Sequence, residues 1–174
     1  MSALLLFPDT CLLINLAHIE RISLLRADFE DKARWTLEVA REVDASKSFV
    51  AGLREVVDFM PEPIVPTPAE RVDTQLIRTQ FLNPGDTEPT KHLGEAETFA
   101  VIERRFAGQS VIVATEDEDV RRFGRAREIQ IINTRVLFAM WVKRGLLQPA
   151  EANQDLHALR DKHNRPVAGF PPLL

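Results

Sequence analysis

The sequence of 174 residues contains no tyrosine and only one cysteine, Cys11. With a single cysteine the chain can form no internal disulfide, no CxxC redox pair and no zinc site built from several thiolates. A chain of this length buries about 70% of the surface that it exposes when unfolded, so its core needs no covalent or metal cross-link. We therefore expect one compact α/β domain in a reducing compartment, the cytoplasm.

Long hydrophobic runs are also absent. The first apolar run, from Ala3 to Phe7, is far shorter than the ~20 residues that cross a membrane, and no basic residue precedes it. We expect neither a signal peptide nor a membrane span. The net charge of −4, from 26 acidic and 22 basic residues, excludes a general polycation, so any nucleic-acid binding must be local.

The residues that are present indicate alternating strands and helices. Four apolar runs end in turn or polar residues and predict strands: Leu4 to Phe7, Ile64 to Val65, Val111 to Ala114, and Ile129 to Ile132. Their continuity is typical of parallel strands covered on both faces. Apolar stripes of helical period lie between or after them: Leu12, Leu13, Leu16 and Ile19; Trp35, Val39 and Val43; Phe99, Ile102 and Phe106; Val136, Met140 and Lys143. This order predicts a three-layer α/β/α fold with a mostly parallel, twisted central sheet.

Carboxylates follow two of the predicted strands, at the edge where ligands of such sheets gather. Asp9 ends the first strand, and the run Glu116 to Asp119 follows Thr115 at the end of another. Helix capping and stabilisation of helix dipoles are equally good explanations for these residues. Further candidates lie on the intervening helices: Glu38 and Glu42 flank one stripe, and Glu95 and Glu97 begin another helix but point to opposite sides of it.

Taken together, these segments resemble the PIN-domain nucleases, especially the VapC-like toxins. LLLFPDTCLLINLAHI is similar to the family's first strand and first acidic residue, VAREV to its glutamate before an apolar position, and LGEAETFAVIERR to its GEAE-type helix start. The segment from Val111 to Leu147 resembles the family's last strand-acid-helix unit. The resemblance covers residues 3 to 148 and predicts a PIN-like domain over 1–148. Residues 149–174, a helix at 150–162 and a proline-rich tail, have no counterpart in it.

The resemblance implies a catalytic site and a metal. By its motifs the catalytic residues are Asp9, Glu42, Glu95 and Asp117, of which Asp9, Glu95 and Asp117 hold the metal and Glu42 is a base or outer ligand. Glu42 is preferred to Glu38, and Glu97 is the reserve for Glu95. Auxiliary positions are Thr10, Thr115, Glu116 and Asp119. Carboxylates without clustered histidine or cysteine select hard cations, Mg²⁺ or Mn²⁺, which suit phosphodiester hydrolysis. The four histidines are scattered without paired spacing, so we assign none of them to the site.

The expected substrate is RNA, bound by Arg121, Arg122 and Arg125 on the helix after the acidic run. Ion pairs between these arginines and the adjacent carboxylates are an equally good explanation of their position. The resemblance further implies an antitoxin protein as partner, and apolar helices near 12–25 and 138–147 leave room for a homodimer. The alternative function is a PIN-like module that has lost catalysis and binds RNA or protein.

Overall fold

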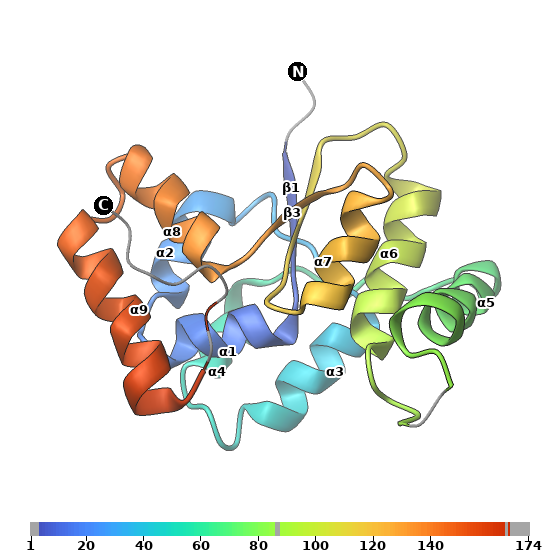
Figure 1. The fold of residues 1–174 in the computed structure, drawn as a ribbon, viewed down its shortest axis with the longest axis horizontal. Helices are drawn as coiled ribbons and strands as arrows, with labels where there is room; N and C mark the ends of the chain where they lie inside the picture. Colours follow the sequence, from blue (N-terminus) through green and yellow to red (C-terminus); the bar gives the residue numbers. More distant parts are fainter. Residues whose placement is uncertain (1–3, 86–87, 166, 168–174) are drawn as a thin grey trace.

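The computed structural model describes residues 4–85, 88–165 and 167, and within them the chain forms a parallel three-stranded sheet flanked by helices (Figure 1). The strands are β1 (Leu5–Pro8), β2 (Val111–Ala114) and β3 (Gln130–Ile132), in the order β1-β2-β3. Pro8 pairs with Ala114, and Ala114 pairs with Ile132, so the three strands end in line. Among the described residues, none of the helices combines the length and apolar character needed to cross a membrane.

Helices make up most of the described chain. In chain order they are α1 (Thr10–His18), α2 (Ile22–Phe29), α3 (Leu37–Ser46), α4 (Leu53–Phe59), α5 (Pro68–Ile77), the π-helix η1 (Arg78–Leu82), α6 (Leu93–Arg105), α7 (Glu118–Arg125), α8 (Thr134–Lys143) and α9 (Pro149–His163). Every connection between sequential strands contains at least one helix, as parallel strands require.

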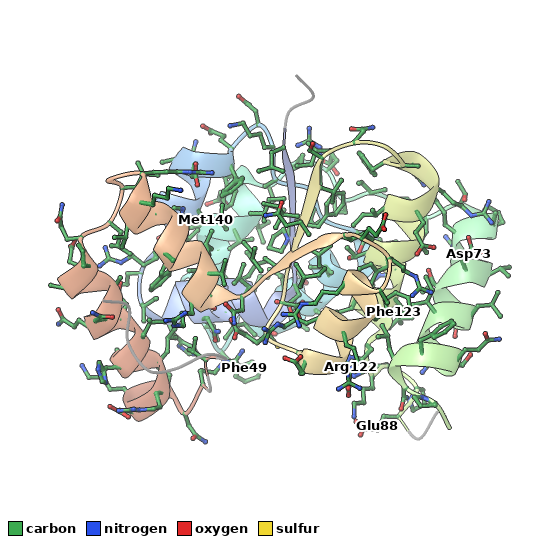
Figure 2. All side chains as sticks on the ribbon, turned by 45° about the horizontal axis from the view of Figure 1, so that its top comes forward. Phe49, Asp73, Glu88, Arg122, Phe123 and Met140 are labelled. Atoms are coloured by element: carbon green, nitrogen blue, oxygen red, sulfur yellow. The ribbon has the colours of Figure 1, made fainter. Side chains whose placement is uncertain are left out.

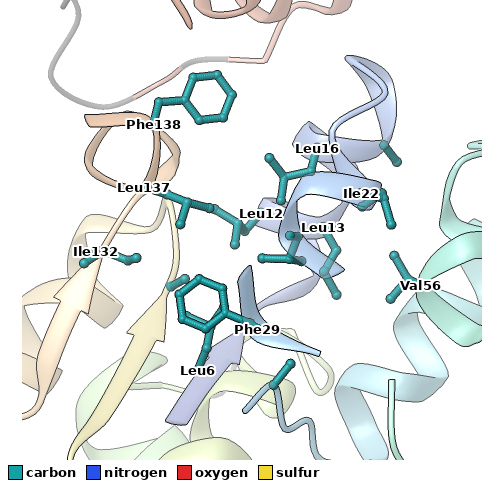
Figure 3. Close-up of a cluster of buried hydrophobic side chains, with 14 of the residues drawn as sticks. Leu6, Leu12, Leu13, Leu16, Ile22, Phe29, Val56, Ile132, Leu137 and Phe138 are labelled. Carbon is teal, nitrogen blue, oxygen red and sulfur yellow. The ribbon is translucent and has the colours of Figure 1, made fainter. Parts of the chain in front are cut away.

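The strands alternate their side chains between two hydrophobic clusters, one on each face of the sheet. Leu6 and Ile112 point into the larger cluster, which they share with α1, α2, α3, α4, α8 and α9 (Figure 3). Phe7 and Val113 point to the opposite face, where α6 and α7 cover them together with η1. The sheet is thus the middle of three layers, as the sequence predicted. β3 departs from the prediction that both faces of each strand are covered, because Gln130 is exposed and Ile131 is only partly buried.

The predicted strand at Ile64 to Val65 is wrong. Ile64 forms only an isolated parallel bridge with Thr36, in which its N–H donates to the Trp35 carbonyl at 2.9 Å. Pro63 and Pro66 flank this short run, and proline has no N–H with which to extend a ladder.

Two predicted helical stripes also need correction. Trp35 lies before the N-cap of α3 and donates from its indole N–H to the Pro61 carbonyl at 2.6 Å, so it is not on that helix. On α8 the buried side chains are Leu137, Phe138 and Trp141, whereas Val136 is 40% exposed and Met140, labelled in Figure 2, is only partly buried. Nearly every residue of α8 is apolar, so periodicity could not select its buried face.

The C-terminal helix belongs to the same core as the rest of the chain. Ala152, Leu156 and Leu159 of α9 are fully buried in the larger cluster, and α9 packs against α8 and α1. Many of the apolar residues on α1, α2 and α8 that suggested a homodimer are used in this internal packing, whereas Leu146 is 43% exposed, and the homodimer stays a prediction. The apolar end at 170–174 lies outside the described residues.

Candidate functional site

The carboxyl ends of the three strands bring Asp9, Thr115 and Asn133 together. The Asp9 N–H donates to the Ala114 carbonyl at 2.9 Å, and the Thr115 N–H donates to the Ile132 carbonyl at 2.9 Å. These bonds extend the strand ladders by one residue, so each of the three side chains emerges where its strand ends. The polar residues that follow the strands therefore share one edge of the sheet, and their role in ligand binding stays a prediction.

Asp9 is the buried centre of this edge, with a relative exposure of 6%. Its Oδ1 accepts a hydrogen bond from the Leu12 N–H at 2.6 Å, which makes it the N-cap of α1. Burial, with the nearby charges of Glu95 and Glu116, raises the pKa of Asp9 to about 8, although the Thr115 and Leu12 hydrogen bonds oppose the shift. Asp9 therefore caps α1 and also lies among the carboxylates of this edge.

Glu42 reaches the same region from α3. Its Oε2 accepts a hydrogen bond from the Thr10 hydroxyl, which fixes the carboxylate beside the first turn of α1. Burial and the charge of Glu95 raise the pKa of Glu42 to about 7, against the effect of the Thr10 bond. A Cβ on Gly94 would lie 3.0 Å from Glu42 Oε1, so the glycine of the GEAE segment lets α6 approach α3 closely.

Glu95 and Asp117 are joined through a residue that the sequence analysis did not select. The imidazole of His92 lies between them, with Nδ1 at 3.6 Å from Glu95 Oε1 and Nε2 at 4.0 Å from Asp117 Oδ2. The Asp117 carboxylate caps α7 by accepting from the Asp119 and Val120 N–H groups. Chiefly because of Glu95, the pKa of His92 is raised. His92 is the N-cap of α6, and its side chain is directed by a left-handed backbone (φ 57°) that no local pattern in the sequence demands, so no sequence signal identified it.

Glu116 belongs to the same acidic edge. Its Oε1 accepts from the Thr134 N–H at 2.7 Å, at the start of α8, and its charge raises the pKa of Asp9. The Thr134 hydroxyl in turn accepts from Asn15 Nδ2 at 3.2 Å. The buried polar residues Asn15 and Thr134, which the sequence analysis missed, thereby connect α1 to the end of β3.

Two of the predicted residues lie apart from this group. Glu97 accepts a hydrogen bond from the Glu38 N–H at 2.9 Å, so it supports the first turn of α3. The choice between Glu95 and Glu97 as a metal ligand stays a prediction. Asp119 is exposed and pairs with Arg122 at 3.3 Å on the surface of α7.

The three arginines predicted to bind nucleic acid are engaged with carboxylates of their own helix. Arg121 and Arg125 pair with Glu118 at 2.8 and 3.7 Å. Arg122, labelled in Figure 2, is 75% exposed in its side chain and pairs with Asp119. Such pairs contribute at most about 1 kcal/mol each and are easily exchanged for a phosphate. The observed contacts are nevertheless those of the alternative explanation, in which these arginines pair with the adjacent carboxylates.

The donor chemistry at this edge fits a hard cation, because carboxylate oxygens predominate and because burial, followed by the charges of Glu95 and Glu116, raises the pKa of Asp9. The arrangement of side chains is less complete. Within the described ranges, no group of three or more histidine, cysteine, aspartate or glutamate residues is placed to hold a metal ion. The His92 ring contacts one carboxylate oxygen of Glu95 and one of Asp117.

A surface cavity of about 670 Å³ lies elsewhere, between the last turn of α6 and the segments that lead into β2 and β3. Its lining includes Gln109, Ser110 and Gln130, at the amino ends of the strands. It contains none of the carboxylates described above, so we place the functional site at the carboxyl edge, where the chemistry is.

Comparison with known proteins adds no relative: no family model matches the chain, and no curated protein matches it.

Proposed function

We propose that this chain is a metal-dependent endoribonuclease with a PIN-like fold, which hydrolyses phosphodiester bonds of RNA at the carboxyl edge of β1 and β2. The single observation that carries the proposal is the buried Asp9 carboxyl, whose pKa is raised to about 8 by burial, Glu95 and Glu116. A site that concentrates acidic groups to this extent favours a cation.

The roles of the residues follow from their positions. Asp9, Glu95 and Asp117 would hold Mg²⁺ or Mn²⁺, which when bound neutralises the scissile phosphate and lowers the pKa of a coordinated water. Glu42, with a pKa of about 7, is suited to accept a proton at neutral pH, and the Thr10 hydroxyl orients it. Thr115 hydrogen-bonds Asp9 and holds that carboxyl in place.

The test is cleavage of single-stranded RNA in the presence of Mg²⁺ or Mn²⁺. Asp117→Asn retains an oxygen that can cap α7 but removes the charge, so it should lower the cleavage rate by about 100-fold or more while the protein stays folded. Asp44→Asn, which removes an exposed carboxylate on α3, serves as the matched control. Equal rates in wild type and Asp117→Asn would refute the assignment.

The position of His92 between Glu95 and Asp117 favours a second candidate, a PIN-like module that binds RNA or protein without cleaving. In this case neither wild type nor Asp117→Asn would cleave, although both would bind RNA or a protein partner.

The nuclease proposal extends to the toxin of a toxin–antitoxin pair. An antitoxin segment that carries an arginine would suit the acidic edge, because a guanidinium pairs with carboxylates through two parallel hydrogen bonds. Inhibition of cleavage by an arginine-bearing peptide, but not by its lysine counterpart, would support this extension.

A further inference from the structure

Arg165, which follows α9 by two residues, lies against α1 through two hydrogen bonds. Arg165 Nε donates to Asn15 Oδ1 at 2.8 Å, and Nη2 donates to the Cys11 carbonyl at 3.2 Å. These contacts join residues 150 and 154 positions apart in the chain. The C-terminal segment, which the family resemblance does not cover, thus reaches the helix that begins at Asp9.

The charge of Arg165 is not neutralised in this contact. Both of its acceptors are uncharged oxygens, and no carboxylate pairs with it in the part of the chain that the structure describes. A guanidinium has five N–H donors, so the two bonds leave donors for another acceptor. Arg121 and Arg122 differ in this respect, since each already pairs with a carboxylate.

Arg165 also lies close to the acidic edge. Cys11, whose carbonyl accepts the Arg165 hydrogen bond, is two residues from Asp9 in the first turn of α1. On the other side, Asn15 donates to the Thr134 hydroxyl, and the Thr134 N–H donates to Glu116. Arg165 is thereby connected by hydrogen bonds to the same carboxylate that acts on Asp9.

We propose that Arg165 binds a backbone phosphate of the RNA strand whose cleavage is proposed above. The inference rests on that proposed function, because a strand that enters the acidic edge needs a cation to offset repulsion between its phosphates and the carboxylates. Asn15 and the Cys11 carbonyl orient the guanidinium without cancelling its charge, so it is preorganised for a phosphate. Arg165 then lies on one wall of the substrate site.

The experiment measures binding of a fluorescent single-stranded RNA dodecamer by anisotropy, over a series of salt concentrations. It uses the full chain carrying Asp117→Asn with Mg²⁺, so that cleavage does not obscure binding. Adding Arg165→Gln should weaken binding about tenfold and reduce the slope of log affinity against log salt by about 0.7, the value for one phosphate contact on a single strand. Arg165→Lys should recover most of the slope, because it restores the charge.

Arg160→Gln is the matched control, since it removes the same charge from α9 at a residue that pairs with Asp161. Its salt slope should equal that of the parent. If Arg165 only anchored the C-terminal segment, Arg165→Gln would lower the melting temperature and leave the salt slope unchanged, and this result would overturn the inference.

Failure of the inference and failure of the nuclease proposal give different results. Cleavage by wild type with an unchanged KM and salt slope in Arg165→Gln overturns the role of Arg165 alone. An Arg165-dependent salt slope without any cleavage by wild type supports the phosphate contact and overturns the nuclease. Absence of both RNA binding and cleavage overturns both.

Discussion

The imidazole Nδ1 of His92 lies 3.6 Å from the Oε1 atom of Glu95. His92 is the N-cap of α6 and adopts a φ of 57°, in the left-handed region that a residue with a side chain rarely occupies. Its side chain is 8% exposed, and its pKa is raised chiefly by the Glu95 hydrogen bond. A cation of the protein itself therefore stands beside the acidic edge when this histidine is protonated.

We predict that His92→Gln increases the affinity for Mn²⁺ several-fold, because it removes a positive charge that competes with the metal for Glu95 and Asp117. The measurement is the metal concentration that gives half of the maximal melting-temperature shift. In both proteins this concentration should fall between pH 6 and pH 8, because Asp9 loses its proton, and in wild type it should fall further, because His92 also becomes neutral as the pH rises. Weaker binding by His92→Gln would instead identify the imidazole as a metal ligand.

A second prediction concerns the stability of the metal-free protein. The pKa of Asp9 is raised to about 8 in the folded chain from an ordinary value of 3.8, so between these values the folded state holds a proton that the unfolded state releases. Stability contributed at this site therefore falls as the pH rises through that window. Asp9→Asn keeps the N-cap of α1 and removes the titration, and we expect it to be about 2 kcal/mol more stable than wild type at pH 8 in EDTA.

The measurement for Asp9→Asn is urea unfolding at pH 5 and pH 8, with and without Mg²⁺. Wild type should gain stability from Mg²⁺, and the variant should not, since it lacks a ligand. Asp44→Asn is the control for loss of a carboxylate. A variant that is less stable than wild type in EDTA at pH 8 would show that the Asp9 charge is already compensated within the protein.

The sequence predicted the placement of this site better than its internal contacts. Asp9 and Thr115 could be located because each directly follows a short apolar strand, and parallel strands end at one edge of a sheet. Glu42 was chosen by its motif, and the structure brings it to Thr10. The sequence could not reveal His92 as the residue between two carboxylates, because its direction depends on a left-handed backbone that no local pattern demands.

Long-range contacts account for most of what was missed. Arg165 and Asn15 are 150 residues apart in the chain, and the sequence around neither residue indicates that they form a hydrogen bond. The same limit applies to α8, where the neighbours in space, and not the periodicity, select Leu137 and Trp141 for the core. The strand expected at Ile64 failed for a local reason, its flanking prolines, that the sequence did contain.

A third prediction concerns acid sensitivity. Glu70, 1% exposed, accepts from Arg105 Nε at 2.6 Å and from the Thr67 N–H at 2.7 Å, and chiefly the Arg105 bond lowers its pKa to about 2. A lowered carboxyl pKa stabilises the fold above the ordinary value of 4.5 and loses this effect as the pH falls towards 2. Glu70→Gln should cost about 1 to 3 kcal/mol at pH 7 and flatten the loss of stability below pH 4.5.

Urea unfolding of Glu70→Gln between pH 3 and pH 7 tests this expectation. Glu55→Gln, which removes an exposed glutamate from the first turn of α4, should leave both the stability and its acid dependence almost unchanged. An equal effect of the two substitutions would mean that the bonds from Arg105 and Thr67 add nothing beyond a surface charge.

The last prediction concerns the attachment of α9 to α1 and its dependence on pH. The rings of His18 and His163 stack with their centroids 4.3 Å apart, and desolvation, His163 and Arg165 lower the pKa of His18 from its ordinary value of 6.5. Because the unfolded chain takes up this proton more readily than the folded one, stability at this contact falls as the pH decreases through 6.5. Amides of α9 should therefore exchange with solvent faster at pH 5.5 than at pH 7.5, after correction for the intrinsic exchange rate, relative to amides of α6.

His18→Phe keeps a ring for stacking and cannot be protonated, so in this variant the ratio of α9 to α6 exchange should be nearly independent of pH. The same pH dependence in His18→Phe as in wild type would assign the effect to the other titratable groups on this surface, which include Glu20, Asp155, His157 and Asp161.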